Sequence, residues 1–377
     1  MILFFISFVA IYGSVHVYAF FRARSALGLG PGGGITRAAF MLAMTLAPVL
    51  IRAVERYGFE LTARVLAYLA YFWMAVLFFY FGASLLFDLL GLITRLIGWI
   101  VSSGVSSWLI PGKTSFLISI GLSLFLCIYG YFEARDIRTE RLVLETSKLP
   151  AGTNRLTIVQ LSDVHLGLIN RCERLAPMLA AVKAAHPDIL VVTGDLVDAQ
   201  INHLTGLAEM FRAITPTYGK FAIMGNHEYY AGTEKALAFI RDAGFTLLRN
   251  EAIASGPITL VGVDDRTGVQ LKLRTAVPEQ TLFTGLARDT FTILLKHQPY
   301  INEASLGLFD LQLSGHTHKG QLFPFTWLTL LSYPLNAGRY DLDRGSILYV
   351  NRGAGTWGPP IRFLAPPEIT VIELVRK

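Results

Sequence analysis

Long uncharged apolar stretches dominate the first third of this 377-residue chain: Met1–Phe21, Val65–Phe87 and Thr114–Phe132. The core of a bilayer takes about 20 apolar residues of helix to cross, and each stretch is close to this length. Inside lipid every backbone amide must be paired within its own segment, so helices are the expected structure. The chain is 53% hydrophobic and only 16% charged, unlike an ordinary soluble domain. We therefore predict an all-α transmembrane anchor over residues 1–133.

A fourth apolar stretch, Ala38–Ile51, is shorter and contains Pro48. Its length fits a re-entrant or interfacial segment. A helical hairpin with the first stretch, however, is the simplest arrangement that keeps its polar backbone groups away from lipid. We therefore expect about four membrane helices. Leu89–Pro111 is also apolar but is interrupted by Arg95, and it contains two tryptophans. It fits a helix lying in the membrane interface, and equally an ordinary loop.

Positive charges beside the apolar stretches set the expected orientation. With four crossings both termini share a side, and that side holds seven flanking Lys and Arg residues against five. The positive-inside rule then predicts a cell-membrane protein with its second half in the cytoplasm. The charges at Arg22 and Arg24, after the first stretch, favour the opposite orientation. Residues 1–150 carry a net charge of +5 and residues 151–377 of +1. This excess suits contact with membrane lipids, so we expect no nucleic-acid partner.

After Pro150 the pattern changes to short apolar runs that end in polar clusters. Leu156–Leu161 is followed by Ser-Asp-Val-His and Ile189–Thr193 by Gly-Asp, with helical patterns such as Arg171–Ala185 between the runs. Continuous apolar runs suit buried strands, and their alternation with helices predicts a layered α/β fold. Ligands of such sheets bind beyond the carboxyl ends of the strands. We expect a linker over residues 134–153, in which the charged stretch Glu133–Pro150 continues the last membrane helix, and the α/β domain over residues 154–377.

Eight polar side chains follow the predicted strands: Asp163, His165, Asp195, Asn226, His227, His297, His316 and His318. Each would cost about 1–3 kcal/mol if it were buried without a partner, and a shared cation supplies that partner. Imidazole and carboxylate together suit Mn, Fe, Zn or Co better than Ca or Mg. The ligands are too many for one ion. Two ions about 3.5–4 Å apart, bridged by a carboxylate, are a known arrangement for phosphate ester hydrolysis.

Five motifs occur in order along the second half: Asp163-Val-His165, Gly194-Asp195, Gly225-Asn226-His227-Glu228, His297 and Gly315-His316-Thr-His318. They resemble the motifs of the calcineurin-like metallophosphoesterase superfamily, and the resemblance covers about residues 154–377. It implies a layered β-sandwich flanked by helices. The C-terminal sequence around Arg352 and Arg362 resembles that of a subgroup of this superfamily whose members often carry amino-terminal membrane helices. Some relatives in that neighbourhood cleave the pyrophosphate of UDP-2,3-diacylglucosamine.

The resemblance also implies the metals and the roles of the residues. It implies two divalent ions, among which Mn is favoured. The first would be bound by Asp163, His165, Asp195 and His318. The second would be bound by Asp195, Asn226, His297 and His316, so that Asp195 bridges both. A hydroxide between the ions would attack phosphorus, and His227 would stabilise or protonate the leaving group. Asp195 and His227 are thus the expected catalytic residues, while Asp198 and Glu228 are expected to orient histidines.

The stretch Leu322–Leu335 follows the last motif and is almost wholly apolar. Beside a membrane anchor it favours a lipid-linked or envelope phosphate compound as substrate, although packing against the protein's own helices explains the same pattern. We therefore predict a metal-dependent phosphoesterase or pyrophosphatase. Two alternatives remain open at this point. One is a membrane sensor or scaffold that binds phosphate without turnover, and the other is a phosphodiesterase of soluble nucleotides.

Overall fold

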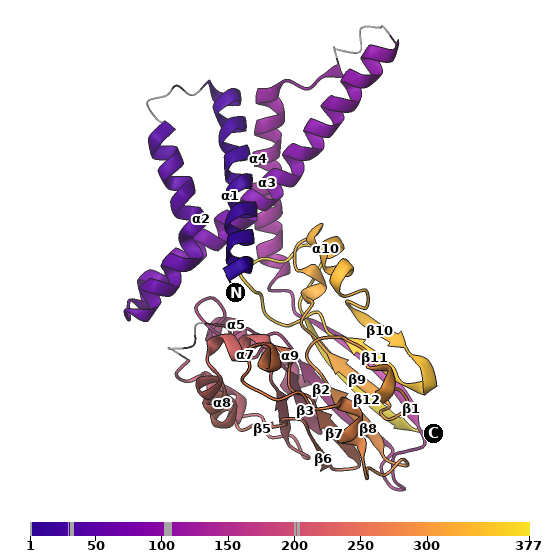
Figure 1. The fold of residues 1–377 in the computed structure, drawn as a ribbon. Helices are drawn as coiled ribbons and strands as arrows, with labels where there is room; N and C mark the ends of the chain where they lie inside the picture. Colours follow the sequence, from indigo (N-terminus) through magenta and orange to yellow (C-terminus); the bar gives the residue numbers. More distant parts are fainter. Residues whose placement is uncertain (1, 29, 31–33, 102–107, 200, 202–203) are drawn as a thin grey trace. The chain divides into compact units, whose positions relative to one another are not determined.

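The computed structural model describes residues 2–28, 30, 34–101, 108–199, 201 and 204–377. The chain divides into two compact units (Figure 1). The first comprises Met1–Phe132 together with Gly358–Ile361, and it is built from helices. The second comprises Glu133–Trp357 and Arg362–Lys377, and it mixes strands with helices.

The first unit contains four long helices, α1 (Ile2–Leu27), α2 (Gly34–Arg56), α3 (Glu60–Val101) and α4 (Gly112–Glu133). All four are long and apolar enough to cross a membrane, so the expected number is confirmed among the described residues. The short fourth stretch is the middle of α2, which has 23 residues and continues through Pro48. The stretch expected to form a loop or a separate interfacial helix begins as the end of α3, a single helix of 42 residues. Residues 102–107 of that stretch lie outside the described residues.

An ion pair joins the apolar helices. Arg22 of α1 lies 2.9 Å from Asp88 of α3, and the Tyr18 hydroxyl donates to the same carboxylate at 2.5 Å. Arg22 also donates to Ser115 of α4 at 3.2 Å. Ionisable groups in a membrane helix are costly unless they are paired, so this contact fixes how the three helices meet.

The second unit consists of two six-stranded sheets that lie face to face (Figure 1). The first has the order β1-β12-β2-β3-β4-β5 and the second β10-β11-β9-β8-β7-β6. The first sheet's strands are β1 (Arg138–Thr146), β2 (Arg155–Leu161), β3 (Ile189–Thr193), β4 (Lys220–Ile223), β5 (Thr246–Leu247) and β12 (Glu368–Arg376). The second sheet's strands are β6 (Glu251–Ser255), β7 (Ile258–Gly262), β8 (Phe291–Leu295), β9 (Leu311–Ser314), β10 (Gly338–Asp341) and β11 (Ile347–Val350).

The central strands of each sheet are parallel, which brings their carboxyl ends to one edge. β2 to β5 run parallel in the first sheet, as do β7, β8, β9 and β11 in the second. The α-helices of this unit are α5 (Cys172–Ala184), α6 (Leu207–Arg212), α7 (Asn226–Ala231), α8 (Thr233–Asp242), α9 (Arg266–Gln270) and α10 (Phe325–Ser332). Short 3-10 turns are η3 (Glu279–Phe283), η4 (Glu303–Ser305), η5 (His318–Gly320) and η6 (Asp343–Gly345).

The main core lies between the two sheets. Buried side chains such as Ile158 and Val191 of the first sheet pack with Ile293 and Leu313 of the second. A second core covers the outer face of the first sheet, where α5, α6 and α8 pack their apolar sides, for example at Phe211. The expected layered β-sandwich flanked by helices is confirmed. The strands of the first sheet are apolar on both faces, and the second sheet covers one face while helices cover the other.

The expectation of a helix between the membrane helices and the α/β domain is wrong, because residues Arg138–Thr146 form the strand β1. Its residues pair in parallel with β12 at the edge of the first sheet, with Leu142 opposite Ile372 and Leu144 opposite Leu374. Leu142 and Leu144 are buried in the core between the sheets, whereas Val143 points outward and is 53% exposed. This alternation has the period of a strand with one buried face, which the many charged side chains obscure in the sequence.

We predict that Leu144→Ala destabilises the chain by about 2–5 kcal/mol, because it leaves a cavity in the core between the sheets. The melting temperature of the full-length protein in detergent, followed by near-ultraviolet circular dichroism, should fall by roughly 4–20 °C. Val143→Ala, one residue away on the exposed face, is the matched control and should change little. Equal effects of the two substitutions would contradict the role of β1 in the core.

Candidate metal centre

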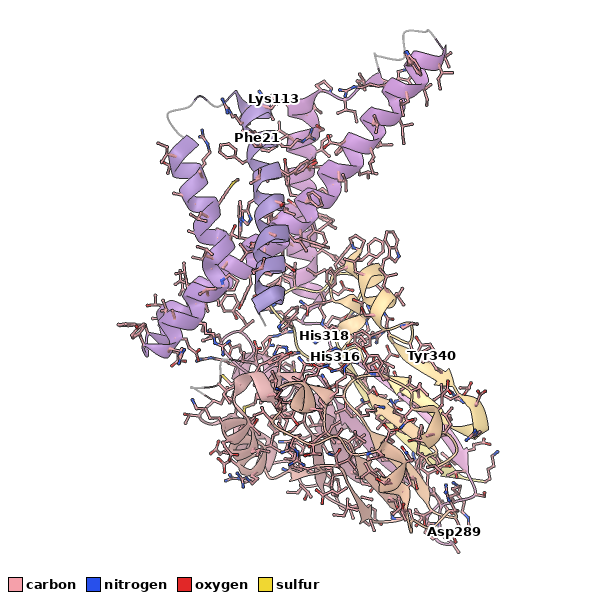
Figure 2. All side chains as sticks on the ribbon, in the orientation of Figure 1. Phe21, Lys113, Asp289, His316, His318 and Tyr340 are labelled. Carbon is pink, nitrogen blue, oxygen red and sulfur yellow. The ribbon has the colours of Figure 1, made fainter. Side chains whose placement is uncertain are left out.

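All eight predicted site residues gather where the parallel strands of both sheets end. Asp163 and His165 follow β2, Asp195 follows β3, and Asn226 with His227 begins α7 just after β4. From the second sheet, His297 follows β8, and the loop 315–318 after β9 supplies His316 and His318. Figure 2 shows the last two histidines close together at one end of the strands. Seven of the eight residues are buried, and His316 is half-buried.

The backbone of the site is held in an uncommon conformation. Left-handed φ values between 48° and 71° occur at five of the predicted ligands, namely Asp163, His165, Asp195, His316 and His318. Such values cost a non-glycine residue on the order of 1–3 kcal/mol, and they persist only where the surrounding structure enforces them. The strands β2, β3 and β9 are therefore each followed by a sharp turn that carries ligands.

Two glycines of the motifs allow these turns to approach one another. A Cβ atom at Gly225 would collide with the Asp195 carboxylate, and one at Gly315 would collide with the carboxylate of Asp163. Any side chain at these positions would therefore push away a carboxylate of the cluster. The glycines are required by the close packing of the loops, which explains why they precede Asn226 and His316.

One half of the cluster gathers around the Nε2 atom of His297. His297 Nδ1 lies 2.8 Å from the carbonyl oxygen of Thr193 and donates its proton there. Nε2 lies 3.1 Å from Asn226 Oδ1, 3.2 Å from His316 Nδ1 and 3.3 Å from Asp195 Oδ2, which are all acceptors. Burial lowers the pKa of His297, but the charge of Asp195 raises it well above its usual range, so a proton on Nε2 is the positive charge that these acceptors share. A bound cation can take the place of that proton.

Tyr333 selects which nitrogen of His316 faces this half of the cluster. The Tyr333 hydroxyl lies 2.8 Å from His316 Nε2 and donates to Gln298 Oε1 at 3.1 Å. Because its single proton is used on Gln298, the hydroxyl accepts from His316, which places the imidazole proton on Nε2. Nδ1 is then free of a proton and can bind a metal. The sequence analysis missed Tyr333, since a tyrosine in an apolar stretch carries no pattern of its own.

The other half of the cluster contains Asp163, His165 and His318. His165 Nε2 lies 3.0 Å from His318 Nε2, 3.8 Å from Asp195 Oδ2 and 4.0 Å from Asp163 Oδ1. His165 Nδ1 is buried and has no hydrogen-bond partner among the described residues. His165 Nε2 thus lies within 4.0 Å of another ring nitrogen and two carboxylates, which are the kinds of ligand that hold a divalent cation.

Arg362 contacts this half of the cluster, although the sequence analysis left it outside the site. Its side chain is fully buried and donates to His318 Nδ1 at 3.0 Å and to the Gly353 carbonyl at 3.0 Å. A guanidinium only donates, so Nδ1 of His318 accepts and its neutral ring carries the proton on Nε2, 3.4 Å from Asp163 Oδ1. Binding a metal through Nε2 therefore requires that this proton leave. His318 differs from His316 in this respect.

The charges of the cluster favour a cation. Burial raises the pKa of Asp195, but the charges of His297 and His227 outweigh it and hold that pKa well below its usual range. Burial lowers the pKa of His165 to about 3, and burial together with the charge of His297 lowers that of His316 to about 3. Both rings are thus neutral and the carboxylate is ionised at neutral pH, as metal ligands must be.

His227 lies against the cluster without being one of the predicted ligands. Its ring centroid is 4.5 Å from that of His165, and its Nδ1 donates to Asp198 Oδ1 at 2.9 Å. Burial lowers the pKa of His227, but the charge of Asp195 and the hydrogen bond to Asp198 raise it to about 9. His227 is therefore an imidazolium that Asp198 orients, as expected for Asp198.

Glu228 does not orient a histidine, and this expectation is wrong. Its carboxylate accepts from the backbone N–H groups of Gly225 at 2.7 Å, Asp195 at 3.0 Å and Val197 at 3.2 Å. It thus ties the loop after β3 to the loop after β4. A buried carboxylate that accepts three backbone donors fixes the position of the bridging residue Asp195 through the main chain.

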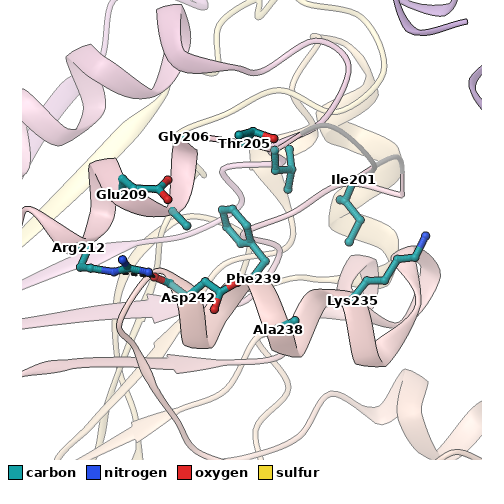
Figure 3. Close-up of a pocket in the computed structure, with 11 residues that line it drawn as sticks. Ile201, Thr205, Gly206, Glu209, Arg212, Lys235, Ala238, Phe239 and Asp242 are labelled. Atoms are coloured by element: carbon teal, nitrogen blue, oxygen red, sulfur yellow. Dashed lines mark hydrogen bonds between the residues drawn. The ribbon is translucent and has the colours of Figure 1, made fainter. Parts of the chain in front are cut away.

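A separate cavity of about 650 Å³ lies between α6 and α8 (Figure 3). It is lined by Glu209, Arg212, Lys235 and Asp242 among others, and Arg212 donates to the Asp242 carbonyl. None of the eight predicted site residues lines it. The metal centre and this cavity are therefore distinct places in the described part of the chain.

Comparisons with known proteins all relate the second unit to phosphoesterases that use metals. The family model for calcineurin-like phosphoesterases matches residues 156–320. An uncharacterized metallophosphoesterase of Aquifex aeolicus is 39% identical over 259 residues, which are 68% of this chain and 98% of that protein. One of Campylobacter jejuni is 36% identical and covers 68% of this chain and 69% of its own length. A transmembrane protein with metallophosphoesterase domain from Danio rerio is 32% identical, over 68% of this chain and 62% of that protein.

We predict that Tyr333→Phe weakens metal binding about 10- to 100-fold, because the proton of His316 is no longer held on Nε2. Titration of the full-length protein with Mn²⁺, followed by the electron paramagnetic resonance of the free ion, measures this. Tyr340→Phe is the control, since the Tyr340 hydroxyl donates to the Ala337 carbonyl and does not contact the cluster. Equal affinities of the two variants would contradict the role of Tyr333.

Proposed function

This chain belongs to the calcineurin-like metallophosphoesterase family and is a metal-dependent phosphoester hydrolase, and on that premise we propose that it acts on a lipid-linked phosphate at a membrane. The bond cleaved is a phosphoester or a pyrophosphate of a lipid or envelope precursor. The four apolar helices anchor the enzyme in the cell membrane, with the catalytic unit in the cytoplasm. The observation that carries the chemistry is the convergence of buried imidazoles on the Asp195 carboxylate, whose Oδ2 lies within 4 Å of both His165 and His297.

We propose that the cluster holds two divalent ions, with Mn favoured. One set of ligands is Asp163, His165, Asp195 and His318. The other is Asp195, Asn226, His297 and His316. When bound, such ions supply a nucleophile from water at neutral pH and neutralise charge on the phosphate. Asp195 belongs to both sets because its Oδ2 lies 3.8 Å from His165 Nε2 and 3.3 Å from His297 Nε2.

The chain itself supplies the proton for the leaving group. His227 is held as an imidazolium by Asp195 and Asp198, and because Nδ1 is bound to Asp198, Nε2 is the atom that would donate to the substrate. A positioned acid of this kind donates to the oxygen that leaves phosphorus. Burial of the cluster excludes bulk water and strengthens the attraction between the imidazolium and the phosphate.

The lipid-linked substrate is supported by the surface beside the site. α10 follows the loop 315–318 and exposes large apolar side chains, among them Trp327 and Leu331. Apolar surface beside a phosphate-binding cluster suits a substrate with both parts. Turnover of soluble nucleotides in preference to lipid phosphates would instead favour a nucleotide phosphodiesterase, and binding without turnover would favour a sensor.

We predict that Asp195→Asn lowers hydrolysis at least about a hundredfold, because it removes the charge that both ligand sets share. The assay is Mn²⁺-dependent hydrolysis of bis(p-nitrophenyl) phosphate by the full-length protein in detergent. Asp289→Asn, at an exposed carboxylate, is the control and should retain activity. Equal turnover by the wild type and Asp195→Asn, or turnover that ignores chelation of the metal, would disprove the proposed hydrolase.

We predict that His227→Gln slows the reaction most for poor leaving groups. With a phenyl or alkyl diester the loss should be about 10²- to 10⁴-fold, because the departing oxygen needs a proton. With p-nitrophenolate, which leaves without protonation, the loss should be smaller. Rates over a series of leaving groups give the slope, which should be steeper in the variant. An equal loss for every leaving group would contradict the role of His227 as an acid.

A further inference from the structure

The segment between the last metal motif and β10 is attached at both ends to residues 317–319, at the end of that motif. Near its start, the Thr326 hydroxyl donates to the Lys319 carbonyl at 2.9 Å. Near its end, the Thr317 hydroxyl donates to the Asn336 carbonyl at 2.6 Å. Helix α10 lies between these two attachments. It is therefore held beside the metal centre by contacts on both sides, and its position is tied to that of the loop.

Helix α10 turns its apolar side chains outward. Its sequence is Phe-Thr-Trp-Leu-Thr-Leu-Leu-Ser, and none of its eight residues is buried. The half-buried positions are Thr326 and Thr329, one turn apart, whereas Leu331 is 81% exposed and Trp327 is 64% exposed. A helix at the surface of a soluble protein turns its apolar side to the core and its polar side to water, and α10 does the reverse. An exposed apolar surface of this kind marks an interaction site.

A lipid bilayer is the occupant that the rest of the chain favours. Four helices of membrane-spanning length precede the catalytic unit, and only residues 134–137 separate α4 from β1. Lys319 precedes the apolar stretch, and a cation beside an apolar segment suits anionic headgroups, whereas Arg339 beyond the stretch is paired with Asp341. Eight helical residues are about 12 Å long, too short to cross a bilayer, so α10 can only lie in its surface.

We propose that α10 is a membrane-docking helix whose side chains enter the boundary between headgroups and acyl chains beside the metal centre. A lipid-borne substrate then brings its phosphate to the ligand cluster while its acyl chains remain in the bilayer. Tyr333 follows α10 directly, and its backbone N–H donates to the Thr329 carbonyl at 2.8 Å. The helix thereby positions the hydroxyl that holds His316, so docking and ligand geometry are mechanically linked.

Spin-label accessibility tests the docking without any need for turnover. The full chain is placed in nanodiscs of phosphatidylethanolamine and phosphatidylglycerol, with Cys172→Ser to remove the exposed free cysteine and Cys127 left buried. A nitroxide is attached at Leu331→Cys, and in a second protein at Leu273→Cys, an exposed leucine in the turn after α9. Collisions with oxygen report lipid, and collisions with a water-soluble nickel complex report water.

We expect the label at position 331 to collide more with oxygen and the label at 273 more with nickel. Two results would overturn the proposal. Equal accessibility to nickel at both positions would place α10 in water. Protection of position 331 from both reagents would place it against protein, for example a second copy of this chain.

The effect on catalysis rests on the proposed function and is measured separately. Leu331→Ser should lower turnover of a phospholipid ester in vesicles, relative to bis(p-nitrophenyl) phosphate, on the order of tenfold or more, as expected when a buried leucine is lost from lipid. Leu273→Ser should leave that ratio unchanged. An unchanged ratio for Leu331→Ser would remove the link between docking and substrate. If neither ester is hydrolysed even by the wild type, the proposed function fails while the accessibility result still stands.

Discussion

The buried carboxylate of Asp195 and the imidazoles around it are the constraint on which the catalytic unit depends. Its Oδ2 lies 3.8 Å from His165 Nε2 and 3.3 Å from His297 Nε2. Such a cluster is stable only with a positive charge in it, either a proton on His297 or a bound cation, because a buried carboxylate needs a partner. The two sheets supply the rigidity that holds the cluster together, since their parallel strands end at the same edge and their shared core is closely packed.

A layer of contacts behind the ligands decides which atom each ligand presents. Thr193 fixes the proton of His297, Tyr333 fixes that of His316, and Asp198 fixes that of His227. These partners come from a strand end, an apolar segment and a loop, so no single element carries the site. Arg362 is the exception among these partners. Its guanidinium donates to His318, whereas the partners of the other three histidines accept a proton from the ring. His316 therefore presents a nitrogen without a proton to the cluster, whereas His318 presents a protonated one and must lose that proton before it can bind a metal.

The sequence predicted the four helices, the layered α/β class and the convergence of the eight polar residues, because each follows from runs of apolar residues and from motifs at their ends. It did not predict β1, whose two inward leucines are hidden among charged residues. It also did not predict the partners Tyr333 and Arg362, or the true role of Glu228. These depend on contacts between segments far apart in the chain, and on left-handed turns that no residue type at those positions announces.

The pairing of β1 with β12 closes the catalytic unit with the first and last strands of its own chain. A protease that cut in the turn between β1 and β2 would separate β1 from the rest of its unit. The released remainder would expose the backbone edge of β12 together with the core side chains that Leu142 and Leu144 cover, and bare edges of this kind promote aggregation. Shedding of an intact soluble enzyme would require a cut before β1, within the four residues that follow α4.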